Sequence, residues 1–103
     1  MEIYAVMVFL NTDTKEQRLD ETRRIVEGLK IATGENPKLI YTVEKTVLAL
    51  AQGDGEKISK AIVEAKSLAT PFILLPISEG YIAAGLMDVQ NWLGPRFRNP
   101  KRP

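Results

Sequence analysis

Residues 3–10, Ile3-Tyr4-Ala5-Val6-Met7-Val8-Phe9-Leu10, form an unbroken apolar run that ends in Asn11-Thr12-Asp13. The run is too short to cross a bilayer, but it is long enough for one β-strand that is buried on both faces. A small sheet usually covers only one face with its own helices. We therefore expect hydrophobic cover on the front and the back of this strand, and the second face requires another subunit, a terminal helix or a ligand.

Two amphipathic helices are predicted after this strand. The first covers residues 14–33, because Thr14 and Gln17 fit a capping box and Gly34 suits the C′ position. The second covers residues 55–69, where apolar residues recur at helical spacing. Its apolar stripe consists of Ile58, Ile62, Ala65, Leu68 and Ala69.

The middle of the chain allows two interpretations. Residues 39–43 and the apolar residues 46–51 are typical of two strands joined by a turn at Glu44-Lys45. This turn lacks the Gly, Asn or Asp that two-residue hairpin loops favour, and Ala and Leu are good helix formers. A short helix over residues 44–52 is therefore the alternative to the hairpin, which we favour.

The last strand is predicted over residues 72–77. Pro76 inside it indicates an edge position or a bulge, because proline cannot donate to the ladder. The order strand–helix–strand–strand–helix–strand predicts a single ferredoxin-like α+β domain over residues 1–94, with the first and third strands central and the fourth at an edge. If residues 44–52 were helical, the chain would be a small three-layer α/β unit.

A further helix is predicted beyond the last strand, with Trp92 beside its apolar stripe and a stop at Gly94-Pro95. The stripe consists of Ile82, Leu86, Val89 and Leu93. This helix could cover the sheet of its own subunit or lie across a dimer partner. Residues 95–103 have no periodicity and contain three prolines, so we expect an extended or disordered basic tail.

The composition excludes several classes of site. The 103 residues include no cysteine and no histidine, which excludes thiolate nucleophiles, Ser-His pairs and the commonest transition-metal ligand. No run approaches the about 20 apolar residues of a membrane span, and the N-terminus lacks the features of a signal peptide. We therefore expect a cytoplasmic protein without a membrane partner.

The formal charge of +1 is unevenly distributed. Residues 1–94 hold 10 Lys and Arg against 13 Asp and Glu, a net −3, whereas residues 95–103 hold four cations and no acid. Cations that flank one aromatic ring suit phosphate contacts with a stacked base. The candidate nucleic-acid-binding residues are Arg96, Phe97, Arg98, Lys101 and Arg102. The alternatives are a solubilising terminus and a segment that docks on an acidic surface.

Asp13 and Glu44 are the candidate catalytic and metal-binding residues. In the predicted sheet, Asp13 follows the first strand at the end that also holds the turn with Glu44. Their carboxylates could then share a Mg²⁺ ion, which prefers oxygen ligands. The favoured interpretation is structural, because Asn, Thr and Asp before a helix are common N-caps and Glu44-Lys45 fits a solvated turn.

The element order and Asp13 resemble small ferredoxin-like endoribonucleases of CRISPR adaptation and related toxin–antitoxin proteins. Those proteins place an acidic residue after their first strand and dimerise. The resemblance covers the topology and one carboxylate, with no diagnostic motif. It implies that the chain cleaves RNA with the help of Mg²⁺ and uses Asp13 for the reaction. The metal ion would then replace the missing histidine.

The favoured function is a non-catalytic binding or regulatory module without a cofactor, which forms a homodimer through its apolar sheet face. The central strands are apolar on both faces, and the usual catalytic groups are missing. The alternative is the Mg²⁺-dependent endoribonuclease, with the basic tail contacting nucleic acid. A third possibility is a cofactor-free enzyme or sensor with an apolar pocket that Tyr4, Tyr41 and Tyr81 line.

Overall fold

The structure is a computed structural model and describes residues 2–43, 45–78 and 87–98. The elements are β1 (Glu2–Phe9), α1 (Lys15–Thr33), β2 (Lys38–Val43), β3 (Thr46–Gly53), α2 (Gly55–Ala65), β4 (Phe72–Ile77) and α3 (Met87–Arg98). The strands form one antiparallel sheet in the order β2-β3-β1-β4, so β1 and β3 are central and β4 is an edge, as their sequence patterns predict. Because β3 is a strand, the hairpin interpretation is confirmed and the three-layer alternative is wrong.

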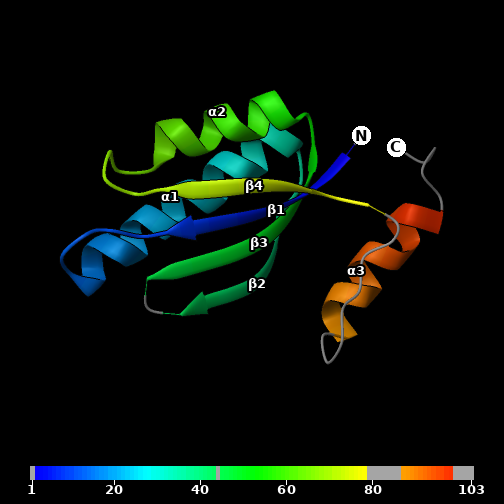
Figure 1. Ribbon diagram of the computed structural model, residues 1–103, viewed down its shortest axis with the longest axis horizontal. Helices are drawn as coiled ribbons and strands as arrows, with labels where there is room; N and C mark the ends of the chain where they lie inside the picture. Colours follow the sequence, from blue (N-terminus) through cyan, green and yellow to red (C-terminus); the bar gives the residue numbers. More distant parts are fainter. Residues whose placement is uncertain (1, 44, 79–86, 99–103) are drawn as a thin grey trace.

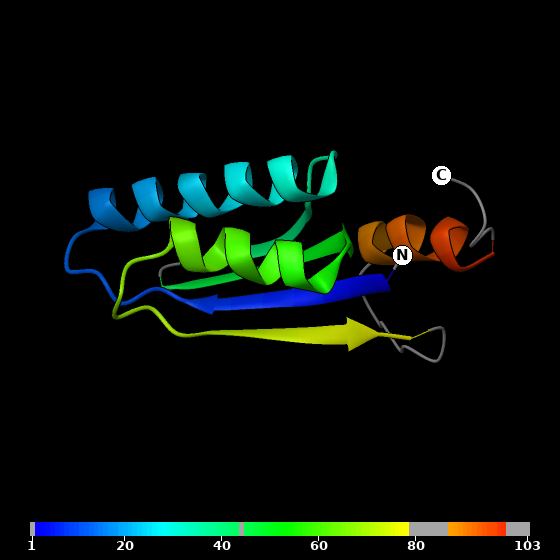
Figure 2. The ribbon, with the colours of Figure 1, turned by 90° about the horizontal axis from the view of Figure 1, so that it is seen from above.

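The helices α1 and α2 lie side by side on one face of the sheet, whereas α3 lies beyond the ends of the strands (Figure 1, Figure 2). The main core fills the space between α1, α2 and the sheet. Its buried members are Val6, Val8, Leu10, Ile25, Leu29, Val47, Ala51, Ile58 and Ile62. Since successive side chains of a strand point to opposite faces, Val6 and Val8 face the helices and Met7 and Phe9 face away.

Both ends of α1 form as predicted. The Thr14 hydroxyl accepts from the Gln17 N–H, and the Gln17 side-chain oxygen accepts from the Thr14 N–H, each at 3.1 Å. Gly34 has a φ of 81°, in the left-handed region that favours glycine, and its N–H donates to the Lys30 carbonyl at 2.8 Å. The capping box and the glycine terminator of this helix are therefore confirmed.

The helix α2 begins after Asp54, which caps it, but ends at Ala65, before the predicted residue 69. The Ser67 N–H donates to the Glu21 carboxylate at 2.8 Å instead of continuing the helical ladder. Leu68 therefore leaves the apolar stripe and is fully exposed. The prediction of a longer helix is wrong because a side chain on α1 competes for this backbone donor.

Pro76 lies near the end of β4. The Phe9 N–H donates to the Pro71 carbonyl at 3.0 Å, so odd-numbered residues of β1 form the hydrogen-bonded pairs with β4. Pro76 lies opposite Tyr4, at a non-hydrogen-bonded position. The backbone nitrogen of Pro76, which carries no hydrogen, therefore points away from β1 toward the open edge of the sheet. The prediction that Pro76 marks an edge strand is confirmed.

The face of the sheet away from α1 and α2 has cover near the start of β1. There Ile3 and Leu50 form a second buried cluster with Val89 and Leu93 of α3. Ile3 is 3% exposed, whereas Phe9 at the other end of the strand is 37% exposed. Among the residues that the structure describes, α3 supplies the expected second cover at Ile3, whereas at Phe9 the cover by another subunit or a ligand stays a prediction, because α3 reaches only one end of the strand.

The sequence predicts that the last helix stops at Gly94-Pro95. This prediction is wrong, because α3 continues to Arg98. A proline removes one helical donor and crowds the preceding turn. Contacts beyond it hold the helix, because Arg96 donates to the Trp92 carbonyl at 3.0 Å and Phe97 packs against the second cluster. The predicted start of this helix and the end of the predicted tail, residues 79–86 and 99–103, lie outside the described residues.

Candidate functional site

Of the two predicted metal ligands, Asp13 and Glu44, the structure describes only the first. Asp13 is exposed in the loop between β1 and α1, and Glu44 lies outside the described residues. Within the described ranges, no group of three His, Cys, Asp or Glu is placed to hold a metal ion. The Mg²⁺ site stays a prediction, for which the structure supplies the position of Asp13 alone.

Arg96 connects α3 to the end of the sheet. Its Nη2 lies 2.6 Å from Glu35 Oε1, and its Nε donates to Gln52 Oε1 at 3.0 Å. The guanidinium carbon lies 3.5 Å from the centre of the Trp92 ring. The guanidinium group of Arg96 is thus paired with groups of its own chain. Arg96 would have to leave Glu35 before it could bind a phosphate.

The other predicted nucleic-acid contacts are placed only in part. Phe97 packs against the second cluster, and Arg98 lies in the last turn of α3. Lys101 and Arg102 lie outside the described residues. The structure therefore gives Phe97 a packing role, while nucleic-acid binding by this segment stays a prediction.

An apolar strip is exposed on the face of the sheet opposite α1 and α2. The strand register aligns Met7 with Leu48 and Ile73, so these side chains share one face. Phe9 and Leu75 lie two residues farther along their strands on the same face. Ile73 is 45% exposed and Leu75 48% exposed. We call these five residues the open strip.

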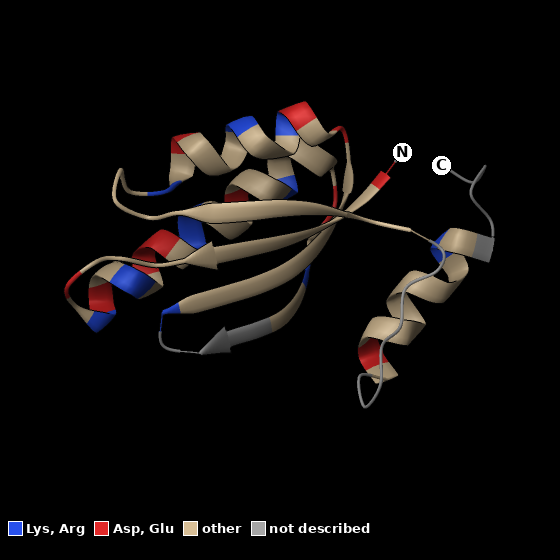
Figure 3. Cartoon of the chain, viewed as in Figure 1, with Lys and Arg blue, Asp and Glu red and all other residues tan. Residues whose placement is uncertain are grey.

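Charged residues are rare on the strands. Figure 3 shows β1, β3 and β4 almost entirely without charge, whereas Lys and Arg are mixed with Asp and Glu along α1 and α2. The five side chains of the open strip are all uncharged. The strip therefore suits an apolar partner surface, and the helical face shows no basic patch suited to nucleic acid.

A groove of about 660 Å³ lies between α1 and α2. Gly28 of α1 faces Ala61 of α2, since a Cβ there would lie 3.4 Å from the Ala61 carbonyl oxygen, an ordinary van der Waals contact. The charged residues of the groove are Arg24, Glu27, Lys57, Lys60 and Glu64. Both signs are present, so the groove lacks the single-sign field that would favour one charged ligand.

Tyr4 is fixed at the start of α2 and does not line this groove. A hydrogen bond to the Glu2 carboxylate, helped by partial burial, raises the pKa of Tyr4 above its ordinary value of 10.0. A Cβ on Gly55 would lie 2.5 Å from the Tyr4 hydroxyl oxygen, so glycine makes room for the ring. The side chain of Tyr41 and all of Tyr81 lie outside the described residues, and the tyrosine-lined pocket stays a prediction.

Sequence reasoning missed a buried polar network around Glu21, which is fully buried on α1. Glu21 Oε2 accepts from the Ser67 N–H, the Ser67 hydroxyl lies 2.8 Å from the Thr70 hydroxyl, and Thr70 accepts from the Asn11 N–H at 3.2 Å. The network joins α1 to the loops before α1 and after α2. The spacing of Glu21 four residues before Ile25 could have revealed it, because it places an acid on the buried stripe.

Comparisons with known proteins assign no family to this chain. No protein-family model matches the sequence, and no significant similarity to a curated protein or a solved structure is found. Among the described helices, none is long and apolar enough to cross a membrane. The open strip and α3 therefore remain the features of this chain that bear on its function.

Proposed function

We propose that this chain is a non-catalytic binding or regulatory module with a ferredoxin-like fold, and that it forms a homodimer through the open strip. The observation that carries the proposal is the uncharged apolar strip on the sheet face opposite α1 and α2 (Figure 3). The fold assignment is supported by the central positions of β1 and β3 and by the two helices on one face.

The lack of charge on the open strip favours a second copy as the partner. A two-fold dimer brings the same patch of both subunits together, and an uncharged strip can do so without like-charge repulsion.

Light scattering at micromolar concentration tests the dimer. We expect a mass of twice 11.5 kDa for the wild type. Ile73→Asp should weaken the dimer by at least about 30-fold without unfolding the chain, because the new charge would lose its hydration inside an apolar interface. Val63→Asp on α2 is the matched control, since Val63 is also an exposed apolar residue.

Two results would contradict the dimer. One is a wild type that stays monomeric at this concentration, and the other is a dimer that Ile73→Asp and Val63→Asp affect equally. Circular dichroism of both variants separates a loss of assembly from a loss of folding.

Incubation of labelled RNA with Mg²⁺ tests whether the module is non-catalytic. We expect the RNA to stay intact with the wild type, with Asp13→Ala and after addition of EDTA. Glu64→Ala removes an exposed carboxylate elsewhere and is the matched control. Cleavage that needs both Mg²⁺ and Asp13 would refute the proposal in favour of the endoribonuclease, whereas cleavage insensitive to both would identify a contaminant.

A further inference from the structure

Ion pairs hold α3 near both of its ends. Asp88 Oδ2 lies 3.8 Å from Lys38 Nζ near the start of the helix, and Arg96 pairs with Glu35 near its end. All four side chains are partly exposed. Exposed pairs of this kind change an equilibrium constant by about five-fold at most, and salt weakens them further.

Among the described residues, the apolar contact beneath α3 has fewer buried members than the main core. They are Val89 and Leu93 on α3 with Ile3 and Leu50 on the sheet, and Trp92 and Phe97 pack against them partly buried, whereas the main core has nine buried residues and none of them belongs to α3. The sheet with α1 and α2 therefore keeps its core when α3 leaves. Detachment of α3 should then need less free energy than global unfolding.

The helix α3 depends on this contact for its helical structure. Its described part, Met87–Arg98, has 12 residues, and Gly94 and Pro95 lie in its last turns. Isolated helices shorter than about 12–15 residues are marginal in water, and glycine and proline are the two poorest helix formers. Docking and helix formation are therefore coupled, and a detached α3 melts.

We propose that α3 is a salt-sensitive, detachable helix that covers one end of the apolar sheet face and exposes it on release. Ile3 lies on the same face of β1 as Phe9, so removal of α3 extends the open strip along the whole strand. This inference rests on the contacts of α3 and does not require the proposed dimer.

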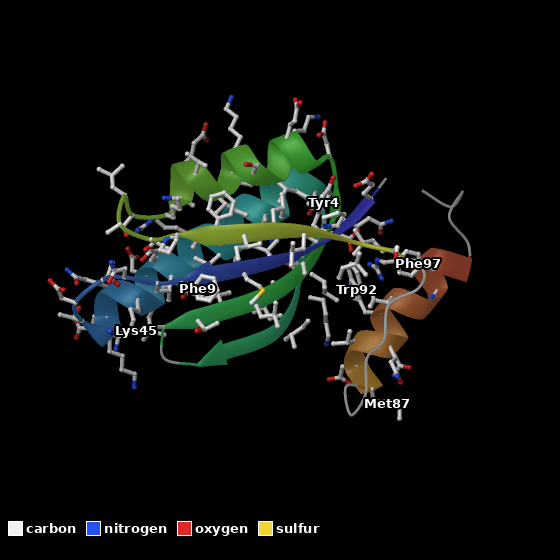
Figure 4. The ribbon with its side chains drawn as sticks, viewed as in Figure 1. Tyr4, Phe9, Lys45, Met87, Trp92 and Phe97 are labelled. Carbon is white, nitrogen blue, oxygen red and sulfur yellow. The ribbon has the colours of Figure 1, made fainter. Side chains whose placement is uncertain are left out.

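Trp92 is the reporter for the test, because it is the only tryptophan of the chain and is stacked on Arg96. Figure 4 shows it between α3 and the ends of the strands, with Phe9 at the opposite end of β1. In the full chain, NaCl raised from about 20 mM to about 1 M should shift the Trp92 emission to longer wavelength. Amide exchange in α3 should accelerate in parallel, while the amides of α1 stay protected.

Three variants complete the experiment. Glu35→Gln should shift the docking equilibrium about two- to five-fold toward the detached state and lower the salt midpoint. Leu93→Ala should give the detached emission already at low salt, whereas Glu64→Gln, which neutralises an exposed carboxylate on α2, should change nothing.

The proposal is overturned if salt and Glu35→Gln leave the emission and the exchange of α3 unchanged. It is also overturned if α3 loses protection only together with α1, because α3 would then belong to the global unfolding unit. A monomeric wild type in light scattering would remove the dimer and leave this inference intact.

Discussion

Val6→Asp is expected to leave the protein unfolded at 25 °C. Val6 is fully buried in the main core, between the sheet and the two helices. An unpaired charge at such a site costs several kcal/mol, and loss of the buried valine removes about 1.5–3 kcal/mol more. This total approaches the whole stability of about 5–15 kcal/mol of an ordinary domain.

Far-UV circular dichroism and urea titration measure this effect. Val6→Ala should fold with reduced stability, and Val63→Asp on the exposed side of α2 should change the free energy of unfolding by less than about 0.5 kcal/mol. A Val6→Asp protein with the wild-type spectrum and a cooperative transition would show that β1 does not lie under the helices. Ile73→Asp separates the two faces, because a charge there is expected to prevent assembly and not folding.

Glu21→Ala should lower the free energy of unfolding by about 2–4 kcal/mol. The substitution leaves the Ser67 N–H without its acceptor and opens a cavity in a buried position. It should also release the turn after α2, because that turn is held to α1 through this hydrogen bond. Denaturant titration gives the stability, and amide exchange at Ser67 reports the loss of the bond.

Glu21→Gln is the informative partner of this variant. It keeps a side-chain oxygen for the Ser67 N–H and fills nearly the same volume in the buried position. We therefore expect Glu21→Gln to recover most of the stability that Glu21→Ala loses. Equal losses in both variants would contradict the stabilising role of the hydrogen bond to the Ser67 N–H.

Local signals in the sequence predicted most of the fold. Thr14 with Gln17 and the left-handed Gly34 fix the ends of α1 through contacts within a few residues, so a sequence pattern can reveal them. The end of α2 could not be predicted in this way. It depends on Glu21, which lies 46 positions before Ser67, and helix propensity carries no information about such a distant acceptor.

The candidate site was predicted less well than the fold, for the same physical reason. The missing periodicity and the three prolines of residues 95–103 predicted an extended tail, but Arg96 is paired with Glu35 and stacked on Trp92. Those contacts hold a helix through Pro95, where local rules predict its end. The double-sided apolar character of β1, in contrast, correctly indicated that α1 and α2 alone would not cover the sheet.

The proline at the rim of the sheet also limits how copies of this chain can associate. A strand from a neighbouring molecule that approached β4 would meet backbone donors at Phe72 and Leu74 and then none at Pro76. Intermolecular sheet extension, which leads to filaments, is thereby interrupted after a few residues. A two-fold contact through the face of the sheet would instead close after two copies.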